Sequence, residues 1–122
     1  PRPKFTWNKR VTSHRGRMIV KPETKPTEVK LWQATNPDAR DFRLETFGPK
    51  WTSSALQPNS KGVFAVQVPA PEKGWTAFFV ELVFDSGQQD IPPFKFTTDV
   101  AVVPDTLPFA EEVAKMKASQ AG

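Results

Sequence analysis

Residues 73–87 read KGWTAFFVELVFDSG, and this stretch decides the fold. From Trp75 to Asp85, apolar side chains occupy both odd and even positions, whereas a strand with one face in water alternates apolar and polar residues. Gly74 precedes the run, and Ser86-Gly87 follows it as a turn signal. The pattern predicts a long central β-strand that is covered on both faces.

The other apolar runs are short, and 13 prolines divide the chain between them. Short strands separated by turn residues are typical of an all-β sandwich or barrel. We therefore predict an all-β fold, an immunoglobulin- or fibronectin-III-like antiparallel β-sandwich of about seven strands with a short C-terminal helix or tail. The further segments predicted to be extended are 4–8, 15–21, 28–34, 41–46, 51–56, 63–68 and 94–103.

Asn36-Pro37-Asp38 resembles a helix start, with an Asn cap and Pro in the first helical position, and predicts one helical turn through Arg40. The whole chain has 122 residues, the size of one ordinary domain. The expected organisation is a linker or first edge strand at 1–10, the sandwich at 11–109 and a short helix or tail at 110–122. Because the chain starts at Pro1 without Met, we expect it to be a piece of a longer protein.

Positive charge is concentrated near the start of the chain. The net charge is +4, and the first 21 residues contain no acid but seven basic residues: Arg2, Lys4, Lys9, Arg10, Arg15, Arg17 and Lys21. One interpretation is attraction to an anionic partner, such as lipid headgroups, lipopolysaccharide, nucleic acid or an acidic neighbouring domain. The other is a solvated linker and first strand. No aromatic residues are interleaved as in a nucleic-acid module, so we expect no nucleic-acid partner.

Four tryptophans offer a second kind of surface. Trp32 or Trp75 is expected in the core, and Trp51, in a polar stretch after Pro49-Lys50, is expected to be exposed. Tryptophans anchor partner surfaces and stack on sugar rings, but they also fill cores and inter-domain contacts. The candidate partner surface consists of Trp51, Trp32, Arg10, Arg15 and Arg17.

Catalytic and metal-binding patterns are scarce. The chain has no cysteine and one histidine, His14, and it lacks the G-x-S-x-G elbow and the glycine-rich phosphate loops. Glu81 lies in the most apolar segment, so we expect a basic partner such as Arg43 on a neighbouring strand. Scattered carboxylates are expected to have structural roles. We predict no catalytic set, no metal and no cofactor in this chain.

Three blocks carry a family resemblance: LWQATNPDARDFRLET at 31–46, KGWTAFFVELVFDSG at 73–87 and FTTDVAVVPDTLPF at 96–109. They resemble the C-terminal region of the PhoPQ-activated pathogenicity-related proteins, and the resemblance spans roughly residues 4–109. It implies a bacterial, virulence-associated parent that is exported to the periplasm or beyond. In that parent, an N-terminal α/β-hydrolase-like part with a serine nucleophile precedes an immunoglobulin- or fibronectin-type sandwich. The nucleophile motif has no counterpart in this chain, so the resemblance assigns no catalytic residue here.

Three functional hypotheses follow. The first is a non-catalytic accessory domain that packs on, or assists, the N-terminal hydrolase-like part of the same parent. The second is an independent module that binds a glycan or an anionic cell-surface component. The third, that the chain is itself an enzyme, rests only on scattered Asp and Glu residues and His14, and it is the least supported.

Overall fold

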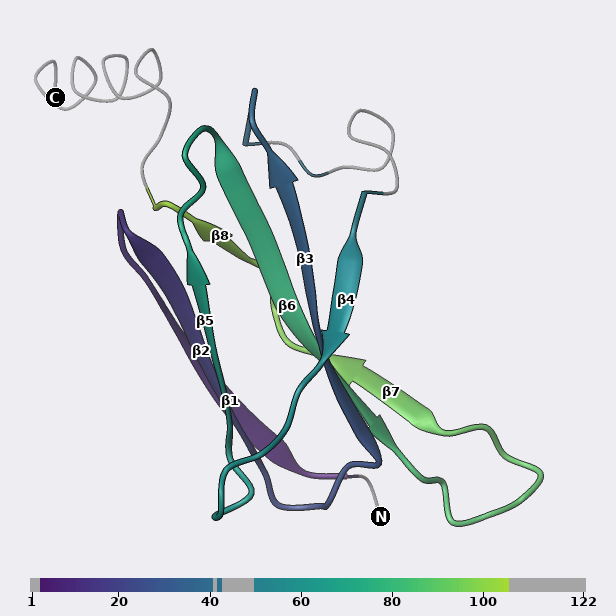
Figure 1. Ribbon diagram of the computed structural model, residues 1–122. Coiled ribbons are helices and arrows are strands. Elements are labelled where there is room, and N and C mark those ends of the chain that lie inside the picture. Colours follow the sequence, from purple (N-terminus) through teal and green to yellow (C-terminus); the bar gives the residue numbers. More distant parts are fainter. Residues whose placement is uncertain (1–2, 41, 43–49, 106–122) are drawn as a thin grey trace, which may run out of the picture.

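The computed structural model describes residues 3–40, 42 and 50–105, and these residues form two antiparallel β-sheets (Figure 1). The smaller sheet has three strands in the order β1-β2-β5, and the larger has five, in the order β4-β3-β6-β7 with β8 also paired to β6. The strand bounds are β1 (Phe5–Val11), β2 (Arg15–Pro22), β3 (Glu28–Asn36), β4 (Thr52–Ala55), β5 (Phe64–Pro69), β6 (Trp75–Phe84), β7 (Phe94–Thr97) and β8 (Ala101–Val103). The prediction of an all-β sandwich is confirmed.

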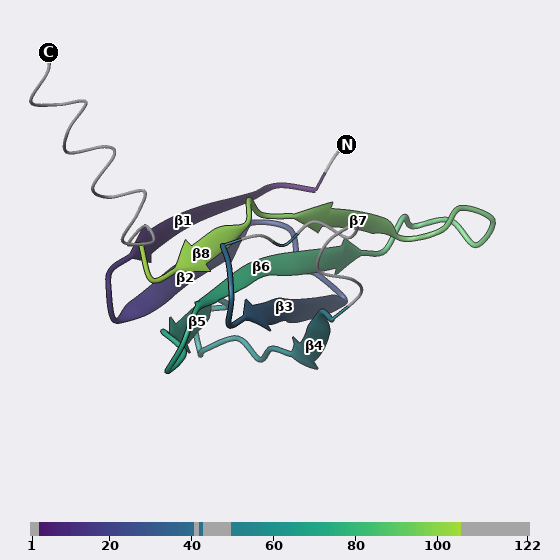
Figure 2. The ribbon, with the colours of Figure 1, turned by 90° about the horizontal axis from the view of Figure 1, so that it is seen from above.

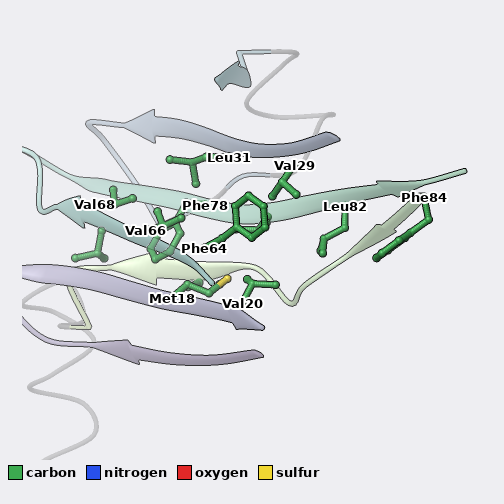
Figure 3. Packing of buried hydrophobic residues seen from close by; sticks show 13 residues of the cluster. Met18, Val20, Val29, Leu31, Phe64, Val66, Val68, Phe78, Leu82 and Phe84 are labelled. Carbon is green, nitrogen blue, oxygen red and sulfur yellow. The ribbon is translucent and has the colours of Figure 1, made fainter. Parts of the chain in front are cut away.

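The core lies between the two sheets and follows directly from alternation along the strands. On β2 and β5 every second residue is buried, and these apolar side chains meet the inward-facing side chains of β3 and β6 (Figure 3). Burying one such side chain stabilises the fold by roughly 1.5–3 kcal/mol. The largest fully buried side chains are Phe78, Phe84, Met18, Leu82, Val20, Val80 and Val103.

The predicted central strand is β6. It pairs with β3 from Trp75 to Val83 on one edge, and β7 and β8 share its other edge. Its inward side chains are buried, and so are Ala77 and Val83, which point to the outer face. The apolar residues on both faces of the 75–85 run therefore correspond to a strand that is largely covered on both sides.

The segment 94–103 was predicted as one strand, and this prediction is wrong because the strand is broken between Thr97 and Ala101. Thr97 pairs with Glu81 and Ala101 with Phe78, so three residues face two on β6. This extra residue is a β-bulge. Thr98 bridges the break: its N–H donates to the Val80 carbonyl (2.9 Å), and its Oγ1 accepts the Val80 N–H (3.0 Å).

The helical turn predicted for residues 36–40 is also wrong. Asn36 ends β3, and its Oδ1 accepts the N–H groups of Asp38 (3.0 Å) and Ala39 (3.2 Å). These are the bonds of a cap, but residues 37–40 form bends rather than a helix. An Asn side chain that bonds the backbone two residues on stabilises a turn equally well.

Some sequence predictions fall outside the described residues. The predicted strand 41–46 is represented only by Phe42, and the predicted helix or tail at 110–122 is not described. The hairpin between β6 and β7 is described, and it projects beyond the sandwich (Figure 2). Within the described ranges, no helix is long and apolar enough to span a membrane.

Candidate interaction surfaces

The predicted partner residues do not form one surface. Trp32 and Trp51 lie on the outer side of the five-stranded sheet, whereas Arg10, Arg15 and Arg17 lie on the outer side of the three-stranded sheet. The core separates the two groups. The structure thus offers two candidate surfaces with different chemistry.

The first surface, called the aromatic face, is the outer side of the five-stranded sheet. Trp32 on β3 lies directly opposite Phe79 on β6, and their rings stack with centroids 6.3 Å apart. Trp51 lies just before β4, and its ring centroid is 5.3 Å from that of Phe79. The ring centroids of Phe42 and Trp51 are 6.3 Å apart. Four half-buried rings from three separate parts of the chain therefore form a continuous row.

Toward one end of the sheet this row borders apolar residues, and toward the other it borders the charged pair Lys30 and Glu81. Ala34 and Ala77, which pair across β3 and β6, are buried on the same side of the sheet, and Val83 is buried further along β6. The indole N–H of Trp32 is buried, and no acceptor reaches it. A buried donor without a partner costs about 1–3 kcal/mol, and this indole presents no polar group to the outside of the face.

The expectations for individual tryptophans are partly wrong. Trp32 and Trp75 both point to the outer face of the larger sheet and are half-buried, and the indole that packs against the core is Trp7. Trp51 is half-buried rather than exposed, because Phe79 lies against it. Sequence reasoning missed Phe79 as a surface residue, although the apolar positions on both faces of its segment pointed to it.

The second surface, called the basic face, is the outer side of the three-stranded sheet. The buried residues of β2 are Gly16, Met18 and Val20, so the alternate residues between and beside them point outward. The exposed cations of this face are Arg10, Arg15, Arg17 and Lys21. Arg10 and Arg17 are direct cross-strand partners, and their side chains therefore stand on the same side.

No carboxylate balances these cations within their own sheet. The strands β1, β2 and β5 contain no Asp or Glu. Two ion pairs among the described residues lie elsewhere, Lys30 with Glu28 (3.4 Å) and Lys73 with Asp38 (3.8 Å). Like charges directly opposite on a sheet are destabilising, so the fold alone does not explain this arrangement.

The described part of the chain contains few candidate catalytic or metal-binding residues. No group of three or more His, Asp or Glu residues there could hold a metal ion. His14 is exposed in the β1–β2 turn, where its backbone N–H donates to Thr12 Oγ1 (3.2 Å). Glu81 is half-buried on the aromatic face, opposite Lys30, and its predicted partner Arg43 lies outside the described residues.

A groove of about 500 Å³ opens between the two sheets near the β2–β3 and β4–β5 connections. Its walls combine prolines with apolar residues such as Leu56 and Phe64, and its charged groups are Glu23, Lys25 and Glu28. None of the residues lining it is a histidine or a serine. The hydroxyl in its lining, that of Thr27, donates to the Val83 carbonyl (3.1 Å).

Fold and surfaces together define a β-sandwich with two chemically different outer faces. The sequence resemblance is confirmed: residues 1–43 match the model of the PhoPQ-activated pathogenicity-related protein family. The chain is also 35% identical, over 127 aligned residues, to Autocrine proliferation repressor protein A of Dictyostelium discoideum. That alignment covers 89% of this chain, which spans about a quarter (26%) of the relative's length.

Among solved structures, one similar chain is that of the crystal structure of a Br derivative of BhCBM56. It has 12% sequence identity and a TM-score of 0.47, and the match covers 85% of this chain and 95% of the other. A likeness at this level does not define a shared ligand.

Proposed function

We propose that this chain is a non-catalytic accessory domain of an exported, virulence-associated, α/β-hydrolase-like protein, and that it packs on the hydrolase-like part through the aromatic face. The observation that carries the proposal is the row Phe42–Trp51–Phe79–Trp32 on the outside of the five-stranded sheet. A contiguous apolar patch on an outer face marks an interaction site. Tryptophans at the centre of such a patch are the usual anchors of a protein–protein contact.

The length of the curated relative supports a role within a larger protein. Since this chain aligns with 26% of that relative, the matching segment there occurs together with much more chain. Contacts between domains of one protein bury about 600–1,500 Å². On the larger sheet the aromatic row has the small residues Ala34 and Ala77 on one side.

The strand order supports the immunoglobulin-like topology that we propose for this domain. In that fold the strands A, B and E share one sheet, and C, F and G share the other. In this proposal β1, β2 and β5, which share the three-stranded sheet, correspond to A, B and E. Strands β3 and β6 correspond to C and F, β7 and β8 together to G, and β4 lies beside β3.

The test uses two matched arginine substitutions in the full-length parent. Ser53 is an exposed residue of edge strand β4, opposite Trp32, and Gln67 is an exposed residue of edge strand β5 on the basic face. Ser53→Arg places a bulky charge beside the aromatic row, whereas Gln67→Arg makes the same charge change on the other face.

We expect Ser53→Arg to lower the melting temperature of the hydrolase-like part and its activity, and Gln67→Arg to change neither. Both substitutions are expected to leave the unfolding of the 122-residue chain within about 0.5 kcal/mol, because both sites are exposed. Equal behaviour of the two variants in the parent, or unchanged activity and melting after removal of the whole domain, contradicts the proposal.

The second candidate function, an independent module for an anionic or glycan component of a cell surface, has its own observation. It is supported by the basic face, whose cations lack carboxylate neighbours in their own sheet. Because this face is opposite to the aromatic one, the two functions are compatible and can be tested separately.

A further inference from the structure

We propose that the basic face binds a linear polyanion, an extended polysaccharide that bears sulfate, phosphate or carboxylate groups. This inference rests on the second candidate function above and does not depend on docking through the aromatic face. Its basis is the placement of Arg10, Arg15, Arg17 and Lys21 on one side of a rigid three-stranded sheet.

The spacing of the cations suits a chain rather than a single small anion. Arg15 and Arg17 are alternate residues of β2, so their Cα atoms lie about 7 Å apart along the strand. Arg10 is the cross-strand partner of Arg17, with a Cβ separation of about 5 Å. Lys21 lies on the same face about 13 Å beyond Arg17. The four charges thus form a track along β2 that widens at Arg17.

The kind of cation also indicates the chemical class of the partner. Three of the four are arginines, whose planar guanidinium groups bind sulfate, phosphate and carboxylate oxygens through two parallel hydrogen bonds. No acidic residue in these strands competes for them. All four side chains are exposed, so a ligand reaches them without rearrangement of the sheet.

The basic face has no outward aromatic ring and no exposed apolar wedge, and this distinguishes a polyanion from nucleic acids, uncharged sugars and lipid bilayers as its partner. The aromatic residues of its strands, Phe5, Trp7 and Phe64, all pack into or against the core. No ring therefore points outward on which a nucleic-acid base or an uncharged sugar would stack. Ile19 is half-buried, and this face has no exposed apolar wedge that would enter a lipid bilayer. Recognition by charge along a flat surface is the remaining chemistry.

The test measures binding of the 122-residue chain to heparin, with neutral dextran and vesicles of phosphatidylglycerol and phosphatidylcholine as comparisons. The key variant is Arg10→Ser/Arg17→Ser. The matched control is Lys61→Ser/Lys95→Ser, which removes the same charge from exposed positions outside the basic face. Circular dichroism and thermal unfolding establish that both variants fold.

We expect the unsubstituted 122-residue chain to bind heparin and not dextran, with affinity falling on the order of 100-fold between 50 and 200 mM salt. The Arg10/Arg17 variant is expected to bind about 10-fold more weakly with a shallower salt dependence, and the control within about 2-fold. An equal loss in both variants shows a mere net-charge effect and overturns the proposal. Tighter binding to the anionic vesicles than to heparin, or no binding to heparin, overturns it as well. If Ser53→Arg alone abolishes heparin binding, the site lies on the aromatic face and the proposal also fails.

Discussion

The two outer faces of this sandwich differ in almost every physical respect, although the same core supports both. The aromatic face is built from half-buried rings with Lys30 and Glu81 beside them, and it contains a tryptophan N–H that no acceptor reaches. The basic face is polar and exposed, and two arginines stand opposite each other on it. The first face is built from stacked rings and the second from neighbouring like charges, so the two faces offer different chemistry to a partner.

Removal of the shared core should abolish both faces together. Phe78→Ala deletes a ring with no exposed surface at the centre of β6, and we expect it to lower the free energy of unfolding by about 3–5 kcal/mol. Thermal or urea unfolding followed by tryptophan fluorescence measures this. A loss below about 1 kcal/mol contradicts the assignment of this ring to the centre of the core.

A matched pair of truncations at the centre of each face sharpens the comparison. Phe79 lies between Trp32 and Trp51, so Phe79→Ala should cost about 2 kcal/mol, whereas Ile19→Ala on β2 should cost about 1 kcal/mol or less. Urea titration of both variants checks this difference. Equal losses would show that the aromatic row is not packed as described.

The next test concerns the bulge between β7 and β8, where the Thr98 side chain bonds to Val80 of β6. Thr98→Val removes the oxygen that accepts the Val80 N–H and leaves this donor buried, which we expect to cost about 1–2 kcal/mol. Thr98→Ser keeps the oxygen and serves as the control. Amide hydrogen exchange at Val80 should accelerate in the first variant and remain slow in the second.

The smallest expected effect has the opposite sign. Arg17→Thr relieves the repulsion with Arg10, so it should raise the free energy of unfolding by about 0.3 kcal/mol at low salt. The gain should vanish at 1 M salt, where the screening length is about 3 Å. A salt-independent change, or a loss of stability, would indicate that the two arginines do not repel each other.

The sequence predicts the strands better than it predicts the surfaces. The segments 15–21 and 63–68 were predicted to be extended and correspond to β2 and β5, and the doubly apolar run at 75–85 predicted the central strand. These features are local. The bulge at Thr98 depends on the register with β6, which no local pattern determines.

The surroundings of the tryptophans likewise depend on strand pairing, which no local sequence pattern determines. Along β3, Trp32 lies on the side opposite to Val29 and Leu31, and its burial depends on Phe79 from another strand. The candidate residues Trp32, Trp51, Arg10, Arg15 and Arg17 were grouped by chemistry alone. Only the pairing of strands into two sheets shows that they belong to opposite faces.

The most direct test of the docking proposal is hydroxyl-radical footprinting of the 122-residue chain and of its full-length parent. The oxidation rates of Trp51 and Phe79 are compared with that of Phe94, an exposed residue of β7. We predict that Trp51 and Phe79 become several-fold less reactive in the parent, while Phe94 is unchanged. Equal reactivity of Trp51 and Phe79 in both proteins would contradict the account.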